Sequence, residues 1–281
     1  MIVVTGATGN VGGTLVRLLA GAGERVTAVS RGATEIALPE GVRHVVADLG
    51  DPDSLSPALD GADALFLLIT GEQLMAGPTP ERILEVAKTG GVRRVVFLSS
   101  QGVATRAESA GYARSAAFER AIRESGLEWT LLRPSGFFSN TWAWSESIRA
   151  ERAVAAPYAE IGLPTIDPAD IAEVAATALR EDGHDQRVYT LTGPQLCTPR
   201  TQAADIGAAI GADVRFAELT REQAKAGMLR FMPEAVAEHT LDILGTPTAA
   251  EQQISPDVER VLGRAPVAYA EWARRHRDVF A

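Results

Sequence analysis

The sequence predicts an α/β fold in which helices cover both faces of a mostly parallel sheet. Three observations lead to this prediction: short β-branched runs alternate with amphipathic stretches, the runs are almost continuously apolar, and a glycine-rich segment joins the first run to the first amphipathic stretch. Such alternation is typical of strand–helix–strand units with right-handed crossovers. Strands that are apolar at nearly every position are expected where helices cover both faces of a sheet.

The expected strands of the first half are short and rich in valine, isoleucine and leucine. They are Ile2–Val4, Arg25–Val29, Arg43–Val46, Ala64–Ile69, Arg94–Leu98 and Trp129–Leu132. Apolar residues recur at the helical period in the segments between them. Helices are therefore expected at Val11–Ala22, Pro80–Thr89 and Tyr112–Ser125.

The pattern changes after Pro134, where residues 135–163 are rich in aromatic side chains and show no strand periodicity. The later segments predict a helix at Pro168–Arg180, a strand at Arg187–Leu191, a helix at Arg200–Ile210, a strand at Asp213–Leu219 and further helices to Phe280. No long linker interrupts the sequence. We therefore expect a core over residues 1–134 and a smaller lobe over residues 135–281, interleaved with the core in one compact unit.

The composition limits the kinds of partner that the protein is expected to bind. The chain has 281 residues, of which 46% are hydrophobic, and a formal net charge of −9. An acidic surface disfavours nucleic acid and anionic membranes as partners. No apolar run approaches the length of a membrane-spanning helix, and the opening residues do not resemble a secretory signal. We expect a cytoplasmic protein, and the composition leaves open whether it is a monomer or a homodimer.

Cysteine and histidine usage gives no sign of a disulfide or a metal centre. Cys197 is the single cysteine, so no intrachain disulfide is possible. The histidines lie far apart and lack the spacing of metal ligands: His44, His184, His239 and His276. We expect no metal site.

The strongest motif is the glycine-rich segment Thr5–Gly12, which follows an apolar strand and opens a helix. One glycine permits the tight turn, a second permits close approach of a pyrophosphate, and a third lets the helix pack against the strand. The helix N-terminus then offers N–H donors and a positive dipole end to the phosphates. A glycine-rich turn without a ligand is the alternative. The context favours a Rossmann dinucleotide site.

The end of the second strand bears on the choice of cofactor. A site for NAD usually has Asp or Glu there, which binds the ribose 2′-hydroxyl. Here the strand ends in Ser30 and Arg31, and the planar guanidinium of arginine suits a 2′-phosphate. NADP(H) is therefore favoured over NAD(H), unless Arg31 is only a solvated loop residue. Asp48, after the third strand, either accepts a hydrogen bond from the adenine amino group or caps the helix expected near Asp51.

Taken in order, several segments of the chain resemble the NmrA-like atypical short-chain dehydrogenase/reductases, a family that includes enzymes similar to NAD(P)H:quinone oxidoreductase. The resemblance covers nearly the whole length and rests on an ordered set of segments: Thr5–Gly12, Val95–Ser100, Ser125–Pro134, Ile166–Ala172, Tyr189–Pro194 and Ala270–Arg275. It implies a Rossmann domain with a small C-terminal lobe and a substrate cleft between them. It also implies either a reductase of quinones, carbonyl compounds or dyes, or a regulator that binds the dinucleotide without turning it over.

The resemblance also assigns residues to the parts of the ligands. It places at the pyrophosphate Gly6, Thr8, Gly9, Asn10, Val11 and Gly12. It places Ser30 and Arg31 at the 2′-phosphate end, Asp48 and Leu49 at the adenine, and Thr70 and Ser99 at the ribose–nicotinamide end. The substrate cleft would be shaped by Phe137, Asn140 and Trp142, with Phe138 and Trp144 as further candidates for an apolar slot or for plain core packing.

The catalytic pattern departs from that of many short-chain reductases, which use a Tyr-x-x-x-Lys pair. The corresponding run begins at Tyr112, and Ala116 stands where the lysine would be. Without that cation Tyr112 would be a poorer proton shuttle. Arg114 lies on a different face of the helix, so it is not expected to replace the lysine. Two interpretations stay open: Tyr112 is a packed aromatic residue near the cleft, or Tyr112 or Ser100 donates a proton as a weaker acid.

The expected function is an NADPH-dependent oxidoreductase that reduces a quinone or an aromatic carbonyl compound. Quinones suit a site with a weak proton donor, because the hydroquinone anion is already stabilised. One alternative is a non-catalytic NADP(H)-binding redox sensor. Another is a tailoring enzyme of secondary metabolism that acts on one polycyclic substrate. Fold alone does not separate these functions.

Overall fold

The computed structural model describes residues 1–32 and 37–281, and its chain divides into two units. Unit 1 consists of Met1–Pro134, Pro168–Leu191 and Asp257–Arg264, and unit 2 of Ser135–Asp167, Thr192–Pro256 and Ala265–Ala281. Two segments that come after Pro134 in the sequence, Pro168–Leu191 and Asp257–Arg264, therefore belong to unit 1.

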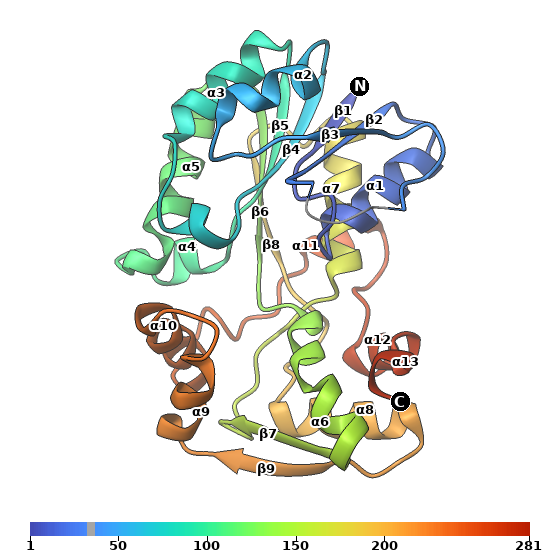
Figure 1. Ribbon diagram of the computed structural model, residues 1–281, viewed down its shortest axis with the longest axis vertical. Coiled ribbons are helices and arrows are strands. Elements are labelled where there is room, and N and C mark those ends of the chain that lie inside the picture. Colours follow the sequence, from blue (N-terminus) through green and yellow to red (C-terminus); the bar gives the residue numbers. More distant parts are fainter. Residues whose placement is uncertain (33–36) are drawn as a thin grey trace. The chain divides into compact units, whose positions relative to one another are not determined.

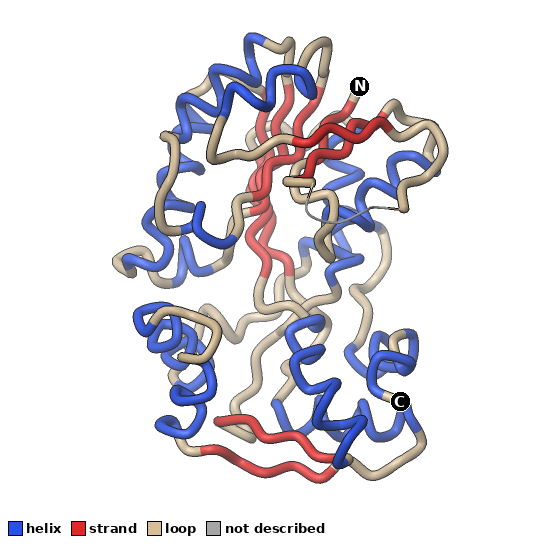
Figure 2. The backbone as a smooth tube through the Cα atoms, in the orientation of Figure 1, coloured by secondary structure: helices blue, strands red, loops and turns tan. Residues whose placement is uncertain are grey.

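Unit 1 is built on a seven-stranded sheet with the order β3-β2-β1-β4-β5-β6-β8, in which every neighbouring pair is parallel (Figures 1 and 2). The strands are β1 (Ile2–Val4), β2 (Val26–Ser30), β3 (Arg43–Val46), β4 (Ala64–Leu68), β5 (Arg94–Leu98), β6 (Glu128–Pro134) and β8 (Arg187–Leu191). This is the strand order of a doubly wound Rossmann sheet, extended by β8. The predicted fold class is confirmed.

Helices cover both faces of this sheet (Figure 1). One face carries α1 (Gly12–Gly21), α7 (Pro168–Arg180) and α11 (Asp257–Leu262). The other carries α2 (Ser56–Leu59), α3 (Pro80–Thr89) and α5 (Ala113–Glu124). Short segments lie in the connections: η1 (Pro52–Leu55), η2 (Gly71–Leu74), α4 (Gly102–Thr105) and η3 (Ala110–Tyr112).

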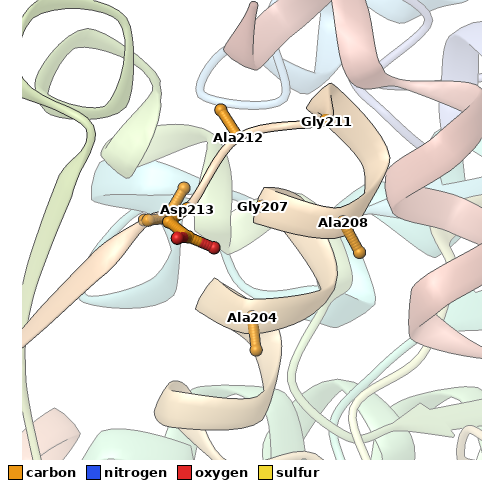
Figure 3. A pocket seen from close by; sticks show the side chains of 7 residues that line it. Ala204, Gly207, Ala208, Gly211, Ala212 and Asp213 are labelled. Atoms are coloured by element: carbon orange, nitrogen blue, oxygen red, sulfur yellow. The ribbon is translucent and has the colours of Figure 1, made fainter.

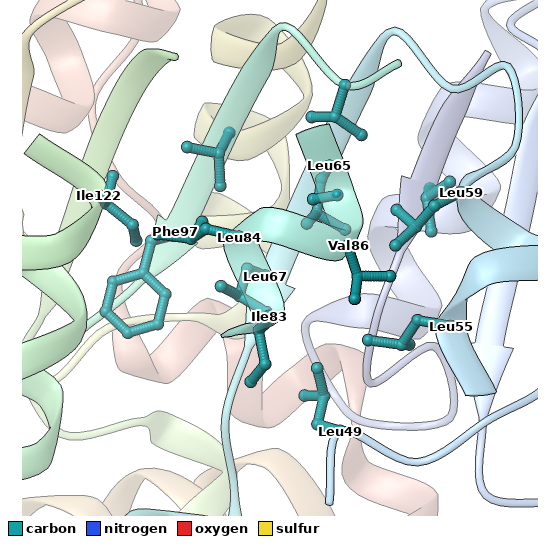
Figure 4. Packing of buried hydrophobic residues seen from close by; sticks show 14 of the residues in the cluster. Leu49, Leu55, Leu59, Leu65, Leu67, Ile83, Leu84, Val86, Phe97 and Ile122 are labelled. Carbon is teal, nitrogen blue, oxygen red and sulfur yellow. The ribbon is translucent and has the colours of Figure 1, made fainter. Parts of the chain in front are cut away.

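The core beneath α3 and α5 is made of alternate residues of the strands and the inner faces of these helices (Figure 4). Leu65, Leu67 and Phe97 point from the sheet toward Ile83 of α3 and Phe118 of α5, and all are buried. The rings of Phe97 and Phe118 stack with centroids 5.5 Å apart. Burial on both faces explains why the strands are apolar at nearly every position.

Unit 2 has a two-stranded parallel sheet of β7 (Ala153–Pro157) and β9 (Arg215–Leu219). Its helical elements are η4 (Phe138–Trp144), α6 (Ser145–Glu151), α8 (Pro199–Ile210), α9 (Arg221–Met228), α10 (Glu234–Gly245), α12 (Tyr269–Arg275) and α13 (Arg277–Phe280). The strand β7 was not predicted, because its Ala-Val-Ala-Ala-Pro sequence is poor in strand-forming residues.

A buried ion pair joins α5 to the end of β6 in unit 1. Glu119 is only 3% exposed, and the Arg133 guanidinium donates to both of its carboxylate oxygens at 2.9 and 2.5 Å. Ser99 donates its hydroxyl to the same carboxylate at 2.7 Å. One carboxylate therefore fixes the positions of β5, β6 and α5 at the carboxyl edge of the sheet.

The substitution Glu119→Gln should lower the free energy of unfolding by about 3 kcal/mol, because it leaves the largely enclosed Arg133 charge, 18% exposed, without its charged partner. The measurement is urea-induced unfolding at neutral pH. Glu85→Gln is the matched control, because Glu85 pairs with Arg82 on the surface and is 66% exposed. That change should cost less than about 1 kcal/mol. Equal small losses for both variants would contradict a structural role for the buried pair.

Candidate functional site

The turn between β1 and α1 lies in the middle of the parallel sheet, at the carboxyl end of its strands. Thr5 opens this turn and ties it to β4, because its hydroxyl donates to the Phe66 carbonyl at 3.0 Å and accepts from the Leu68 N–H at 2.9 Å. Gly6 follows with a φ of +65°, a conformation that glycine adopts without strain. The chain is thereby turned toward the start of α1.

The start of α1 packs so closely on this turn that a side chain does not fit there. A Cβ at Gly12 would overlap the carbonyl oxygen of Gly6, which is backbone and has no freedom to move aside. The Gly9 N–H donates to the same carbonyl at 2.9 Å. Thr8, Gly9 and Asn10 are exposed above the helix N-terminus. The close packing thus holds these three exposed residues beside the start of α1.

These features fit the pyrophosphate of a dinucleotide. Val11, the N-cap residue of α1, makes no side-chain cap bond, and a helix N-terminus offers N–H donors and a positive dipole end that suit a phosphate. Val11 and Gly12 are buried and hold the helix against β1. Thr8, Gly9 and Asn10 are the predicted pyrophosphate residues with exposed surface.

Ser30 and Arg31, the residues predicted for the 2′-substituent of the adenosine ribose, lie at the end of β2. Ser30 is the last residue of β2 and is 9% exposed, whereas Arg31 directly after it is exposed. The end of β2 itself carries no carboxylate, as its sequence Val-Thr-Ala-Val-Ser shows. This arrangement fits a phosphate at the 2′ position better than a free hydroxyl.

Asp48 and Leu49 follow β3 and differ in how they are engaged. The Asp48 carboxylate accepts from the Gly50 N–H at 2.8 Å and from the Gln73 side-chain amide at 2.9 Å, both on Oδ1. The segment η1 has Asp51 as its N-cap and shows no side-chain cap bond, so capping of η1 does not explain Asp48. The Leu49 side chain belongs to the core beneath α3.

The residues predicted for the nicotinamide end follow β4 and β5. Thr70 is exposed directly after Ile69. Ser99 is half-buried, and its hydroxyl donates to Glu119 inside the protein. The involvement of Glu119 was not predicted, although its position seven residues after Tyr112 places it on the same face of α5.

The structure brings Tyr112 and Ser100, the two predicted catalytic residues, to the same glycine. The Tyr112 ring lies against Gly102, where a Cβ would overlap the ring and the phenolic oxygen. The Ser100 hydroxyl accepts from the Gly102 N–H at 3.2 Å. Both hydroxyl-bearing side chains therefore flank the start of α4.

No cation replaces the missing lysine from the next positions of α5. Ala116 lies one helical turn after Tyr112. Arg114 is directed elsewhere: it donates to the Gln73 carbonyl and, at 2.6 Å, to the Pro78 carbonyl, and its guanidinium lies 5.4 Å from the Phe118 ring centroid. Arg114 therefore holds the segment that follows β4.

The predicted substrate residues belong to unit 2. Phe137 is half-buried and forms a β-bridge with Ile166, and Asn140 is exposed. The Trp142 ring stacks on Trp272 with centroids 6.2 Å apart, and its indole N–H is buried without a hydrogen-bond partner among the described residues. Asn140 is therefore the exposed polar residue of η4, whereas the Trp142 N–H is enclosed.

Phe138 does not line a slot. It is fully buried and packs edge-on against Tyr269 at 5.0 Å and against Trp272 at 5.9 Å. The interpretation of Phe138 as core is therefore the one that the structure supports. Trp144 is half-buried against the same core.

Elsewhere in unit 2 a shallow hollow of about 590 Å³ lies at the end of α8 (Figure 3). It is lined by Ala204, Gly207, Ala208, Gly211, Ala212, Asp213 and Val214. Asp213 is its one charged residue, and the lining has no nucleophile or cation. Within residues 1–32 and 37–281, no cluster of three or more histidine, cysteine or acidic side chains is suited to a metal ion. No helix among those residues is long and apolar enough to span a membrane.

The sheet order and the glycine turn define the class of protein, a Rossmann-fold binder of a dinucleotide. Residues 6–182 match the family described as NAD(P)H-binding. The chain belongs to this family. Membership in an NAD(P)H-binding family was predicted from the sequence and is confirmed.

Two relatives that are similar over their full length are reductases by name. The chain is 36% identical to a (4-alkanoyl-5-oxo-2,5-dihydrofuran-3-yl)methyl phosphate reductase of Streptomyces griseus subsp. griseus, covering 100% of this chain and 99% of the relative. It is 32% identical to an NAD(P)H azoreductase of Xenophilus azovorans, covering 100% and 99%. The fold is shared with an NADPH-dependent quinone oxidoreductase of Escherichia coli solved with NADPH, at a TM-score of 0.80, 23% identity and coverage of 98% and 99%.

The contact between Gly102 and Tyr112 predicts a coupled effect on stability. Gly102→Ala should lower the free energy of unfolding by about 1–2 kcal/mol, because the Tyr112 ring must move to make room for the methyl group. In a Tyr112→Ala background the same change should be neutral or stabilising by up to about 1 kcal/mol, because alanine is the better helix former. Urea unfolding of the four proteins measures both effects. The same loss in both backgrounds would show that Tyr112 does not occupy this position.

Proposed function

We propose that the protein is an NADPH-dependent reductase of a conjugated, electron-poor acceptor such as a quinone or an aromatic carbonyl compound. The observation that carries the proposal is the full-length similarity to reductases, combined with a dinucleotide turn whose second strand ends in Ser30-Arg31. A non-catalytic sensor would need only the turn.

The cofactor would be held along the carboxyl edge of the sheet of unit 1. The turn residues Gly6, Thr8, Gly9, Asn10, Val11 and Gly12 would bind the pyrophosphate, with Gly6 and Gly12 shaping the turn and the exposed residues facing the phosphates. Ser30 and Arg31 would lie at the 2′-phosphate, and Asp48 and the Leu49 backbone at the adenine. Thr70 and Ser99 would lie at the ribose–nicotinamide end.

The bound cofactor supplies a hydride, and the acceptor must then tolerate the negative charge that this transfer creates. A simple ketone gives an alkoxide, which needs a strong proton donor. Ala116 stands where the lysine would be, and the predicted proton donors Tyr112 and Ser100 both lie at Gly102. A conjugated acceptor delocalises the charge and needs a weaker proton donor. The site therefore suits conjugated acceptors.

The names of the similar proteins agree with this chemistry. Each refers to a conjugated acceptor: an azo group, a quinone, or an unsaturated lactone whose ring double bond is conjugated to two carbonyl groups. The residues of unit 2 that would contact such an acceptor are Phe137, Asn140 and Trp142. Asn140 is exposed, so its side-chain amide is the group that would meet the oxygen atoms of the acceptor.

A second candidate substrate class is an acylated unsaturated lactone that carries a phosphate ester. The relative with 36% identity over the whole chain favours it. Such a substrate has a single ring and so differs from the polycyclic substrate of the tailoring-enzyme alternative.

The test is NADPH consumption, followed by the absorbance of the reduced nicotinamide, with a panel of quinones, azo dyes, aromatic ketones and unsaturated lactones. Saturated ketones and lactones of matched size are the controls. Turnover confined to conjugated acceptors is expected. Stoichiometric binding of NADPH with no turnover of any acceptor would replace the proposal with the sensor.

Arg31→Ala should weaken NADPH binding by about 2 kcal/mol, or about 30-fold, because a charge-assisted contact to the 2′-phosphate is lost. NADH has no such phosphate, and its dissociation constant should change less than about twofold by comparison. Fluorescence titration measures both constants. Arg93→Ala, which removes an equal charge from the amino-terminal side of β5, should alter neither. Equal losses for NADPH and NADH in Arg31→Ala would refute the 2′-phosphate assignment.

Tyr112→Phe should lower kcat with a quinone by less than about tenfold, because the product anion is delocalised and needs little proton donation during hydride transfer. Steady-state kinetics at saturating NADPH gives the comparison. A loss of about 10²-fold or more is the size expected for removal of a general acid. That result would make Tyr112 the proton donor despite Ala116.

A further inference from the structure

A histidine on the edge strand of the sheet is hydrogen-bonded to the residue that precedes Arg31. The Nε2 atom of His44 lies 2.8 Å from the hydroxyl oxygen of Ser30. Ser30 ends β2 and is 9% exposed. His44 lies on β3 opposite Ala28, so its ring reaches two residues along the neighbouring strand to meet Ser30.

The same serine oxygen also closes the turn around Arg31. It accepts from the Gly32 N–H at 3.3 Å. Gly32 has a φ of +77° and packs against Val46, whose Cγ1 would lie 2.9 Å from a Cβ at this glycine. Ser30 and Gly32 are the two chain neighbours of Arg31, so this hydroxyl fixes the backbone on both sides of the arginine.

The Ser30 hydroxyl bonds to both His44 and Gly32, which makes His44 part of this turn. A serine hydroxyl has one donor and two acceptor positions. The Gly32 N–H takes one acceptor position, and His44 takes either the donor or the second acceptor position, according to the tautomer of its ring. With either tautomer, the hydrogen bond to the imidazole restrains the Ser30 side chain. An exposed imidazole therefore holds a nearly buried hydroxyl in one orientation.

We propose that His44 is a positioning residue for Arg31 and thereby contributes to selectivity for a 2′-phosphorylated dinucleotide. The inference rests on the proposed use of NADPH. His44 acts through Ser30 and the Ser30-Arg31-Gly32 turn, which directs the guanidinium to the phosphate and reduces the conformational freedom lost on binding. His44 lies outside the glycine turn, and it was not among the residues predicted to bind NADP(H).

The experiment measures dissociation constants for NADPH and NADH in the wild type, His44→Ala, His44→Gln, Ser30→Ala, Arg31→Ala and the double variant His44→Ala/Arg31→Ala. His44→Ala and Ser30→Ala should each weaken NADPH about tenfold and NADH less than about twofold. His44→Gln, whose amide reaches a similar position, should restore most of the NADPH affinity. In the double variant, loss of His44 should have no further effect, because the arginine it positions is absent.

The outcomes separate this inference from the proposed function. A wild-type protein that does not prefer NADPH over NADH would overturn the proposed cofactor. A wild-type preference that Arg31→Ala abolishes and His44→Ala leaves intact would overturn the role of His44 alone. Equal weakening of both cofactors by His44→Ala, or full additivity with Arg31→Ala, would also overturn it. Thermal unfolding of each variant checks that β3 and β2 stay folded.

Discussion

The close contact between the start of α1 and the turn after β1 is the constraint on which the cofactor site depends. Gly12 lies so near the Gly6 carbonyl that any side chain would separate the helix from the turn. The Thr5 hydroxyl fixes the other end of the turn to β4. With both ends fixed, Thr8, Gly9 and Asn10 face outward and α1 presents its N-terminus beside them.

The parallel order of the sheet then brings the other candidate residues to the same edge. Ser30, Asp48, Thr70 and Ser99 each follow or end a strand from β2 to β5, and the carboxyl ends of parallel strands meet at one edge. The buried Glu119–Arg133 pair supports this edge and engages the Ser99 hydroxyl. In the proposed cofactor site, Ser99 would therefore contribute by its position in the chain and not by a free hydroxyl.

Elements with strong local patterns were predicted well from the sequence. The bounds of β3, β5, α3 and α7 were predicted residue for residue, because β-branched runs or helix-initiating prolines mark them clearly. The strand β7 was missed, since Ala153–Pro157 becomes a strand through pairing with β9, about sixty residues later. His44 at Ser30, Glu119 at Ser99 and Tyr112 at Gly102 were missed for a similar reason: each contact joins different segments, and the sequence carries no local signal for it.

The central claim is that the β1–α1 turn holds one NADPH, with its 2′-phosphate at the end of β2. Isothermal titration of the protein with NADPH and with NADH tests it most directly, because binding is measured without any assumption about the acceptor. One site per chain with tighter binding of NADPH is the predicted result. Absence of binding to both cofactors would contradict the account of the turn, and tighter binding of NADH would contradict the account of Arg31.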